Sequence, residues 1–208
     1  MGSRVIDDYP RRTHLEFYRR YPDPFYSLTF ELEVTALLQV VRREGLPVYA
    51  GLCWGFHRAL LAVAAFRVRL VGEDVVLHDE LGLGMTVPGP QRTFNFLHRA
   101  WDAEPRRFLT ETAAATRAAA AELGLRGGGE APDSAYYTTL PRVAFTGFNH
   151  APLADTTAGQ PMIAFGKLRD DAGRVRVPVG LQVNHMYVDG ADIGDLVEAA
   201  EQSFARAF

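Results

Sequence analysis

The stretch VNHMYVDG, residues 183–190, ends the longest strand-like run of the chain and begins its last helix-like run. Residues 174–187 have the pattern of a long strand, and residues 190–207 have the pattern of an amphipathic helix. A histidine that a rigid strand delivers into a turn can act as a general base if its ring faces a cleft. His185 is therefore the candidate catalytic residue of the chain.

Two residues that follow His185 are suited to shape this turn. The carboxylate of Asp189 can take an arginine side chain or backbone N–H groups as partners. Gly190 allows a left-handed conformation between the turn and the helix. Taken alone, His-x-x-x-Asp-Gly is a weak pattern, so its meaning depends on the rest of the chain.

Strand and helix patterns alternate along the whole sequence. Thr35 is expected to cap its helix, and Gly45 to close it. Residues 126–134 are the most linker-like segment but are too short to mark a boundary, so a single domain over residues 1–208 is predicted. The alternation predicts an α/β fold, an α+β two-layer sandwich of a mixed β-sheet with helices on one side. Helices are expected at 13–21, 35–44, 48–65, 104–123 and 190–207, and strands at 26–34, 66–70, 75–78, 85–88, 93–97, 143–148, 162–168 and 174–187, with a turn at 169–173.

The composition restricts the classes of partner. With a net charge of −3 and a sequence pI near 6.1, no basic surface is implied, which disfavours nucleic acid. No glycine-rich phosphate loop follows a strand, and the acidic pairs at 170–171 and 31/33 are not spaced like metal ligands. We therefore expect a small-molecule substrate and no metal site.

The termini and the cysteine content indicate a cellular compartment. Residues 1–12 carry no apolar signal core, and no apolar run is long enough for a membrane helix, so a cytoplasmic protein without membrane contact is expected. The single cysteine, Cys53, lies in an apolar helix-like run and is expected to be a buried, inert thiol. The remaining histidines, at 14, 57, 78, 98 and 150, are expected at the surface, in helix packing or in a loop.

Three separated segments carry a family resemblance. They are RRTHLEFYR (11–19) followed by FYSLT (25–29), LPRVAFTGFN (140–149), and PMIAFGK (161–167) running on to the His185 motif. Together and in this order they resemble the chloramphenicol acetyltransferase family over about the whole chain. Wider acyltransferase groups share the His185 motif, but in chains about twice as long.

The resemblance implies an architecture and a mechanism. The enzyme would be a homotrimer whose active sites lie between neighbouring subunits. His185 would take a proton from an acceptor hydroxyl as that oxygen attacks an acyl thioester. Asp189 would pair with Arg11 inside the subunit and hold the catalytic loop. Residues lining the acceptor pocket would include Phe17, Tyr18 and Tyr26.

Three substrate-binding positions depart from the family pattern. Gly147 stands where the family has the serine that stabilises the oxyanion, Ala164 where it has a threonine, and Asn184 where a histidine precedes the catalytic one. Loss of one oxyanion donor typically costs on the order of a hundredfold in rate. An acceptor other than chloramphenicol is therefore predicted, with Thr146 or a water as a substitute donor.

The donor side is altered as well. Lys167 and Tyr49 match the family's coenzyme A channel, but a lysine expected just before Tyr49 is replaced by the run Leu46-Pro47-Val48. Loss of that cation weakens binding of the coenzyme's terminal phosphate. The sequence therefore predicts acyl-CoA or an acyl carrier protein as co-substrate and no permanently bound cofactor.

Four functions follow from these features. The first is acyl transfer from a thioester to a hydroxyl or amine with His185 as base, and the second is ordinary chloramphenicol resistance. The third keeps the base for a biosynthetic cyclisation, elimination or isomerisation, which does not need the serine-type donor. The fourth is a non-catalytic binding or assembly protein on the trimeric scaffold.

Overall fold

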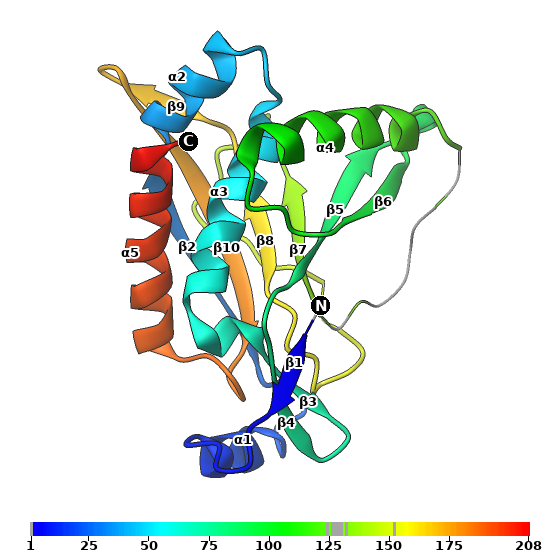
Figure 1. Ribbon diagram of the computed structural model, residues 1–208, viewed down its shortest axis with the longest axis vertical. Coiled ribbons are helices and arrows are strands. Elements are labelled where there is room, and N and C mark those ends of the chain that lie inside the picture. Colours follow the sequence, from blue (N-terminus) through cyan, green and yellow to red (C-terminus); the bar gives the residue numbers. More distant parts are fainter. Residues whose placement is uncertain (1, 124, 126–130, 132, 152) are drawn as a thin grey trace.

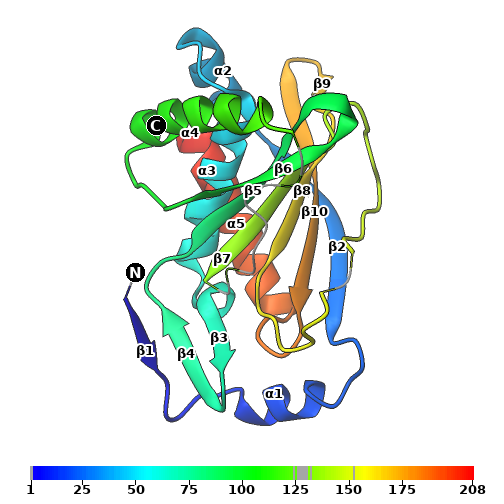
Figure 2. The same cartoon turned by 90° about the vertical axis from the view of Figure 1, so that its right-hand side faces the viewer.

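The main body of the protein is a mixed β-sheet whose one face is covered by helices (Figures 1 and 2). The computed structural model describes residues 2–123, 125, 131, 133–151 and 153–208. The helices are α1 (Arg12–Tyr18), α2 (Thr35–Arg43), α3 (Val48–Ala62), η1 (Ala64–Arg67), η2 (Pro90–Arg92), α4 (Pro105–Ala120) and α5 (Gly190–Arg206). The strands are β1 (Ser3–Val5), β2 (Phe25–Glu33), β3 (Val68–Val71), β4 (Asp74–His78), β5 (Gly82–Pro88), β6 (Phe94–Arg99), β7 (Ser134–Thr139), β8 (Met162–Phe165), β9 (Arg169–Asp171) and β10 (Arg174–Asn184).

The large sheet has the strand order β2-β10-β8-β7-β5-β6, with β9 paired to β10. Strand β7 runs parallel to β5 and to β8, whereas the other pairs are antiparallel. Helices α3 and α5 pack on one face, and β1, β4 and β3 form a separate small sheet beside α1 (Figures 1 and 2). The predicted mixed sheet with helices on one side is confirmed.

Alternation along β10 explains this layering. Val177, Val179, Leu181 and Val183 are buried in the core, as their spacing of two requires for one face of a strand. Helix α3 is buried on nearly every side, which agrees with its almost wholly apolar sequence. No helix within the described ranges combines the length and apolar character that crossing a membrane requires.

Several predicted elements differ from the structure. Residues 143–148 form no strand, because the chain turns at Leu140, whose carbonyl accepts from the Val143 N–H, and β7 occupies the place beside β8. Strand β1 and strand β7 were not predicted, and β9 lies within the predicted turn. Residues 126–130 and 132 of the predicted linker, and Gly124 after the predicted 104–123 helix, lie outside the described residues.

Two predicted backbone roles are also corrected. Thr35 is the first helical residue, not the cap: its hydroxyl donates to the Glu33 carboxylate and accepts from the Val175 N–H. Gly190 begins α5 without a left-handed φ, whereas Gly45 has a φ of 65° and closes α2 as expected.

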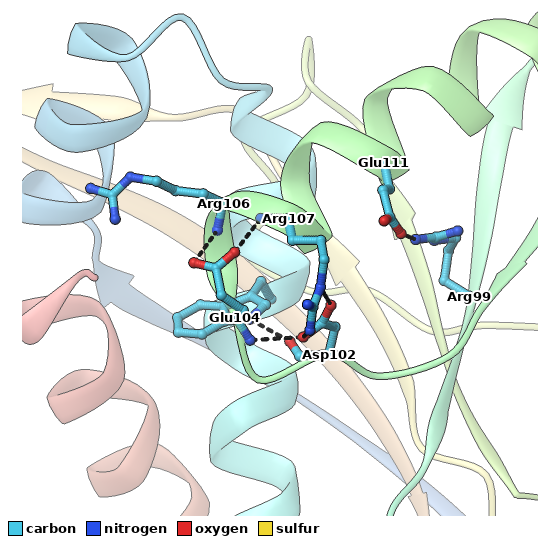
Figure 3. A network of polar contacts seen from close by, with 7 residues as sticks. Arg99, Asp102, Glu104, Arg106, Arg107 and Glu111 are labelled. Carbon is cyan, nitrogen blue, oxygen red and sulfur yellow. Dashed lines mark hydrogen bonds and ion pairs between the residues drawn. The ribbon is translucent and has the colours of Figure 1, made fainter.

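Charged residues fix the start of α4 (Figure 3). The Glu104 carboxylate caps the helix by accepting from the N–H groups of Arg106 and Arg107, at 3.3 and 2.6 Å. Arg107 also pairs with Asp102, and together with the cap this lowers the free energy of a helix end that otherwise lacks N–H partners.

A polar cluster lies inside the core, on α3. Both ring nitrogens of His57 are engaged: Nδ1 with the Tyr137 hydroxyl at 3.0 Å and Nε2 with the Leu81 carbonyl at 2.9 Å. Burial lowers the pKa of His57 to about 4. Cys53 is buried one turn away, and burial raises the pKa of its thiol, as expected for an inert cysteine.

This cluster predicts a stability that falls in acid. In the unfolded chain His57 binds a proton near its ordinary pKa of 6.5. In the folded chain it binds a proton only near a pKa of about 4. The contribution of His57 to the free energy of unfolding is therefore complete above about pH 6.5 and is lost as pH falls toward 4, by about 3 kcal/mol.

Urea unfolding measured across this pH range should show the slope of the unfolding free energy against pH. Burial also lowers the pKa of His150 to about 4 and lowers that of His78, so His57→Gln should reduce the slope without abolishing it, whereas removal of the exposed His14 in His14→Gln should keep it. An unchanged slope in His57→Gln would contradict the assignment.

Candidate active site

His185 follows the last residue of β10 and lies between two tyrosine rings. Its imidazole stacks on Tyr18, with ring centroids 4.2 Å apart and planes 13° apart, and lies 4.7 Å from the Tyr26 ring. Its backbone N–H donates to the Pro24 carbonyl at 2.9 Å, which ties the turn to the chain just before β2. The half-buried ring is thus held in one plane.

A single hydrogen bond sets the chemistry of this imidazole. Nδ1 of His185 lies 3.1 Å from the Val188 carbonyl oxygen, and Tyr26 donates to the same oxygen at 3.4 Å. Because a carbonyl can only accept, the Nδ1 contact requires the proton to be on Nδ1. The other nitrogen, Nε2, then carries the lone pair that a general base needs.

Arg11 and Asp189, predicted as partners, are in contact. Arg11 Nη1 lies 3.2 Å from Asp189 Oδ2 and 2.7 Å from Asp192 Oδ2, and all three are at least partly shielded from solvent. Partial burial pushes the pKa of Asp189 upward, but the Ala191 N–H and the guanidinium outweigh it and lower that pKa. The pair therefore ties the turn that contains His185 to the start of α1 as an ionised bridge.

Asp192 is a residue of the candidate site that sequence reasoning missed. Asp189 and Asp192 form a capping box at the start of α5, in which Asp192 accepts the Asp189 N–H at 2.8 Å. The spacing of a capping residue and an acid three positions later was the available signal.

Removing this carboxylate should destabilise the fold moderately. Asp192→Ala deletes half of the capping box and the shorter of the two Arg11 contacts, so unfolding free energy should fall by about 1–2 kcal/mol. Asp195→Ala, an exposed acid one turn further along α5, is the matched control and should change it by less than about 0.5 kcal/mol. Urea denaturation measures both, and equal losses would argue against the bridging role.

Phe17 lies beside this group at the surface. The residue is 53% exposed, and its ring meets Tyr18 edge-on, with centroids 5.1 Å apart, and lies 5.3 Å from the Tyr21 ring. Tyr18 and Tyr26 thus contact His185 directly, and Phe17 extends this aromatic cluster to the exposed surface.

Three further predicted residues, Gly147, Ala164 and Lys167, form a second group, away from the first. Ala164 is buried on β8 and pairs in register with Gly180, five residues before His185 on the same strand run, which corresponds to roughly 16 Å of extended chain. Gly147 is exposed, with no atom within 4 Å of the position that a Cβ would take, and Lys167 is exposed. The structure thus separates Ala164 from His185 within one chain, and no atom of His185 lies within 4 Å of the Cβ position at Gly147.

Tyr49 occupies a more enclosed position than its predicted role required. Its hydroxyl donates to the Tyr137 carbonyl at 2.9 Å, and burial raises its pKa well above the ordinary value. Asn184, the third departure from the family pattern, is 2% exposed and belongs to the His185 turn.

A hollow on β5–β7 adjoins the second group. It measures about 380 Å³ and is lined by Thr86, Val87, Pro88, Thr93, Phe94, Thr138 and Thr139. The Thr86 hydroxyl donates to that of Thr138 at 2.7 Å, and Thr138 is the register partner of Ala164. Larger hollows of about 510 and 530 Å³ lie along α5 and are lined by neither His185 nor Gly147. Sequence reasoning missed these threonines, because threonine in a strand carries no functional signal.

Comparisons with known proteins agree with the fold. Residues 3–201 match the family model described as chloramphenicol acetyltransferase. A chloramphenicol acetyltransferase of Bacillus pumilus is 24% identical over 200 residues, which are 95% of this chain and 91% of that protein. A solved chloramphenicol acetyltransferase superposes with a TM-score of 0.84 at 18% identity, covering 98% of this chain and all of that one. The dihydrolipoamide acetyltransferase of Azotobacter vinelandii gives a TM-score of 0.66 at 18% identity, covering 93% and 86% of the two chains.

The fold and the family match define an enzyme of the acyltransferase class. The chain belongs to the chloramphenicol acetyltransferase family. The resemblance inferred from its three sequence segments is thereby confirmed.

Proposed function

We propose that the protein transfers an acyl group from a thioester to a hydroxyl or amine of a small molecule other than chloramphenicol, with His185 as general base. The observation that carries this proposal is the Nδ1 contact with the Val188 carbonyl at 3.1 Å, which leaves Nε2 free to accept a proton. The stacked Tyr18 ring keeps that nitrogen in a fixed direction.

In this reaction one nitrogen, His185 Nε2, first accepts a proton and then releases it. His185 Nε2 takes the acceptor proton while the acceptor oxygen or nitrogen forms a bond to the thioester carbonyl carbon. The tetrahedral oxyanion then collapses, the carbon–sulfur bond breaks, and the proton on Nε2 passes to the leaving thiolate. Asp189 and Arg11 touch no reacting atom and support the turn.

We further propose a homotrimer whose sites lie between subunits. Within one chain, the position of Ala164 is roughly 16 Å along the strand from His185, too far for both positions to border one reacting carbonyl. A neighbouring subunit could bring its own hollow, containing Thr86 and Thr138, to the aromatic cluster around His185. Sedimentation equilibrium tests this assembly, and an active monomer would overturn it.

Lys167 and Tyr49 are the residues proposed to bind the acyl donor. Lys167 is exposed and can bind a phosphate, whereas the Tyr49 hydroxyl is already bonded, so only its ring is available to a pantetheine arm. Both acyl-CoA and an acyl carrier protein present this arm, and either serves as co-substrate.

The test is thiol release from acetyl-CoA with a panel of aromatic and aliphatic alcohols and amines, chloramphenicol included. Because Cys53 is buried, the folded protein contributes no reactive thiol to the assay. Acceptor-dependent release with an acceptor other than chloramphenicol is expected. Chloramphenicol as the fastest acceptor would overturn the substrate assignment, and a product formed from an acceptor without any thioester would favour cyclisation, elimination or isomerisation.

A further inference from the structure

Two buried side chains of the turn around His185 form hydrogen bonds to the backbone of a neighbouring loop. Asn184 Nδ2 donates to the carbonyl oxygens of residues 156 and 158, at 2.9 and 3.0 Å. The Tyr187 hydroxyl donates to the carbonyl between them, at 2.7 Å. The two side chains are 2% and 1% exposed, and they stand on either side of His185 in the sequence. Three successive carbonyls are thus bound from the turn that carries the base.

The loop is shaped to be held in this way. The Asp155 carboxylate accepts from both the N–H and the hydroxyl of Thr157, each at 2.8 Å, so residues 155–158 form a closed turn. Gly159 follows, and a Cβ there would lie 3.0 Å from the Tyr187 ring and 2.9 Å from Arg69. The close approach of the loop to Tyr187 therefore requires glycine at this point.

Tyr187 also connects the turn to the small sheet. Its oxygen accepts the Leu70 N–H of β3 at 3.3 Å. The neighbouring Arg69 is 2% exposed and donates to the carbonyls of Phe66 and Val68, at 2.9 and 2.7 Å. Burial raises the pKa of Tyr187 to about 12, so its hydroxyl remains a donor at neutral pH. The turn is thus anchored on two sides that lie far apart in sequence.

Asn184 also connects the loop to the residues that position the His185 imidazole. Its Oδ1 accepts the Met186 N–H at 2.9 Å, and its backbone oxygen accepts the N–H groups of Tyr187 and Val188, both at 3.1 Å. The Val188 carbonyl, which binds His185 Nδ1, is therefore located by the residues that Asn184 holds.

We propose that Asn184 and Tyr187 are positioning residues that clamp the loop 155–159 to the turn and thereby hold the Val188 carbonyl where it fixes the tautomer and ring plane of His185. The inference deepens the proposed function and rests on it. The family pattern has a histidine at the position of Asn184. The contacts that Asn184 makes with the loop are therefore a feature of this chain and not of the family pattern.

The test compares Tyr187→Phe and Asn184→Ala with Tyr137→Phe in the full-length protein. Tyr137 is equally buried, and its hydroxyl contacts His57 at 3.0 Å in the core, so Tyr137→Phe likewise removes one buried hydroxyl, at a place away from the turn. In protein with ¹⁵N-labelled histidine, the ring nitrogen shifts of His185, assigned with His185→Ala, report the tautomer without any substrate. Unfolding by urea and acetyl-CoA turnover with the fastest acceptor of the panel complete the comparison.

We expect Tyr187→Phe and Asn184→Ala to show mixed His185 tautomers and about tenfold lower kcat, with KM for acetyl-CoA unchanged. Tyr137→Phe should lose stability but keep the wild-type His185 shifts and kcat. Wild-type shifts in both turn variants would overturn the proposal, because they would reduce the clamp to a stability element. If Asn184→Ala does not fold, Tyr187→Phe alone decides. If the wild type transfers no acyl group, the proposed function fails while the tautomer comparison still decides the clamp.

Discussion

His185→Ala is expected to lower kcat for acyl transfer by about 10³-fold. General-base catalysis by a positioned side chain contributes between about 10² and 10⁴ in rate, and the fixed ring of His185 corresponds to the middle of that range. Binding of acetyl-CoA should change little, because no proposed donor contact involves the imidazole. The loss should therefore appear in kcat and leave KM for acetyl-CoA nearly unchanged.

The control for this variant is His14→Ala, which removes an exposed histidine of α1 and should leave kcat unchanged. Circular dichroism and urea unfolding of His185→Ala show whether the turn survives without the ring. More than a tenth of wild-type turnover in a folded His185→Ala protein would falsify the role of His185 as base.

Gly147→Ser is expected to raise kcat by roughly a hundredfold. The family pattern has a serine at this position, and one oxyanion donor is worth about 10²–10³ in rate. The space that a Cβ would enter is open, with no atom within 4 Å, and the backbone is not left-handed there, so serine fits without strain. The new hydroxyl would reach the oxyanion from the subunit opposite His185.

Gly147→Ala is the matched control, because it adds the same Cβ without the hydroxyl. Its kcat should stay at the wild-type value, and thermal unfolding should be alike in both variants. Equal rates in the serine and alanine variants would mean that no oxyanion forms near this position. That result would favour the proton-transfer chemistries that need no such donor.

The core of the fold was predictable because its signal is local. Strand β10 and helix α5 have strong periodicity, and their junction at His185 lies close to the predicted place. Strand β7 was missed because its residues follow a loop-like segment and pair in parallel with strands distant in sequence, which no local pattern reports. Residues 143–148 alternate like a strand, yet they follow the turn at Leu140 and form no strand, although the Val143 carbonyl accepts the Lys167 N–H at 2.8 Å beyond the end of β8.

The site was predictable only where the resemblance fixed the residues. Arg11 and Asp189 are far apart in sequence, and their contact was inferred from matched positions, not from spacing. Asp192, Tyr187 and Thr138 act through tertiary contacts that the matched segments do not reveal. Their side-chain types are ordinary at these positions, so only the folded arrangement distinguishes them.

The strand order has a consequence for how the polypeptide is made. Strand β2 emerges early from the ribosome, and its neighbour within the described sheet is β10, which is translated near the end. For the seconds in between, at about 5–20 residues per second, the apolar side of β2 has no permanent cover. Closure of this part of the sheet is therefore a non-local and slow step of folding.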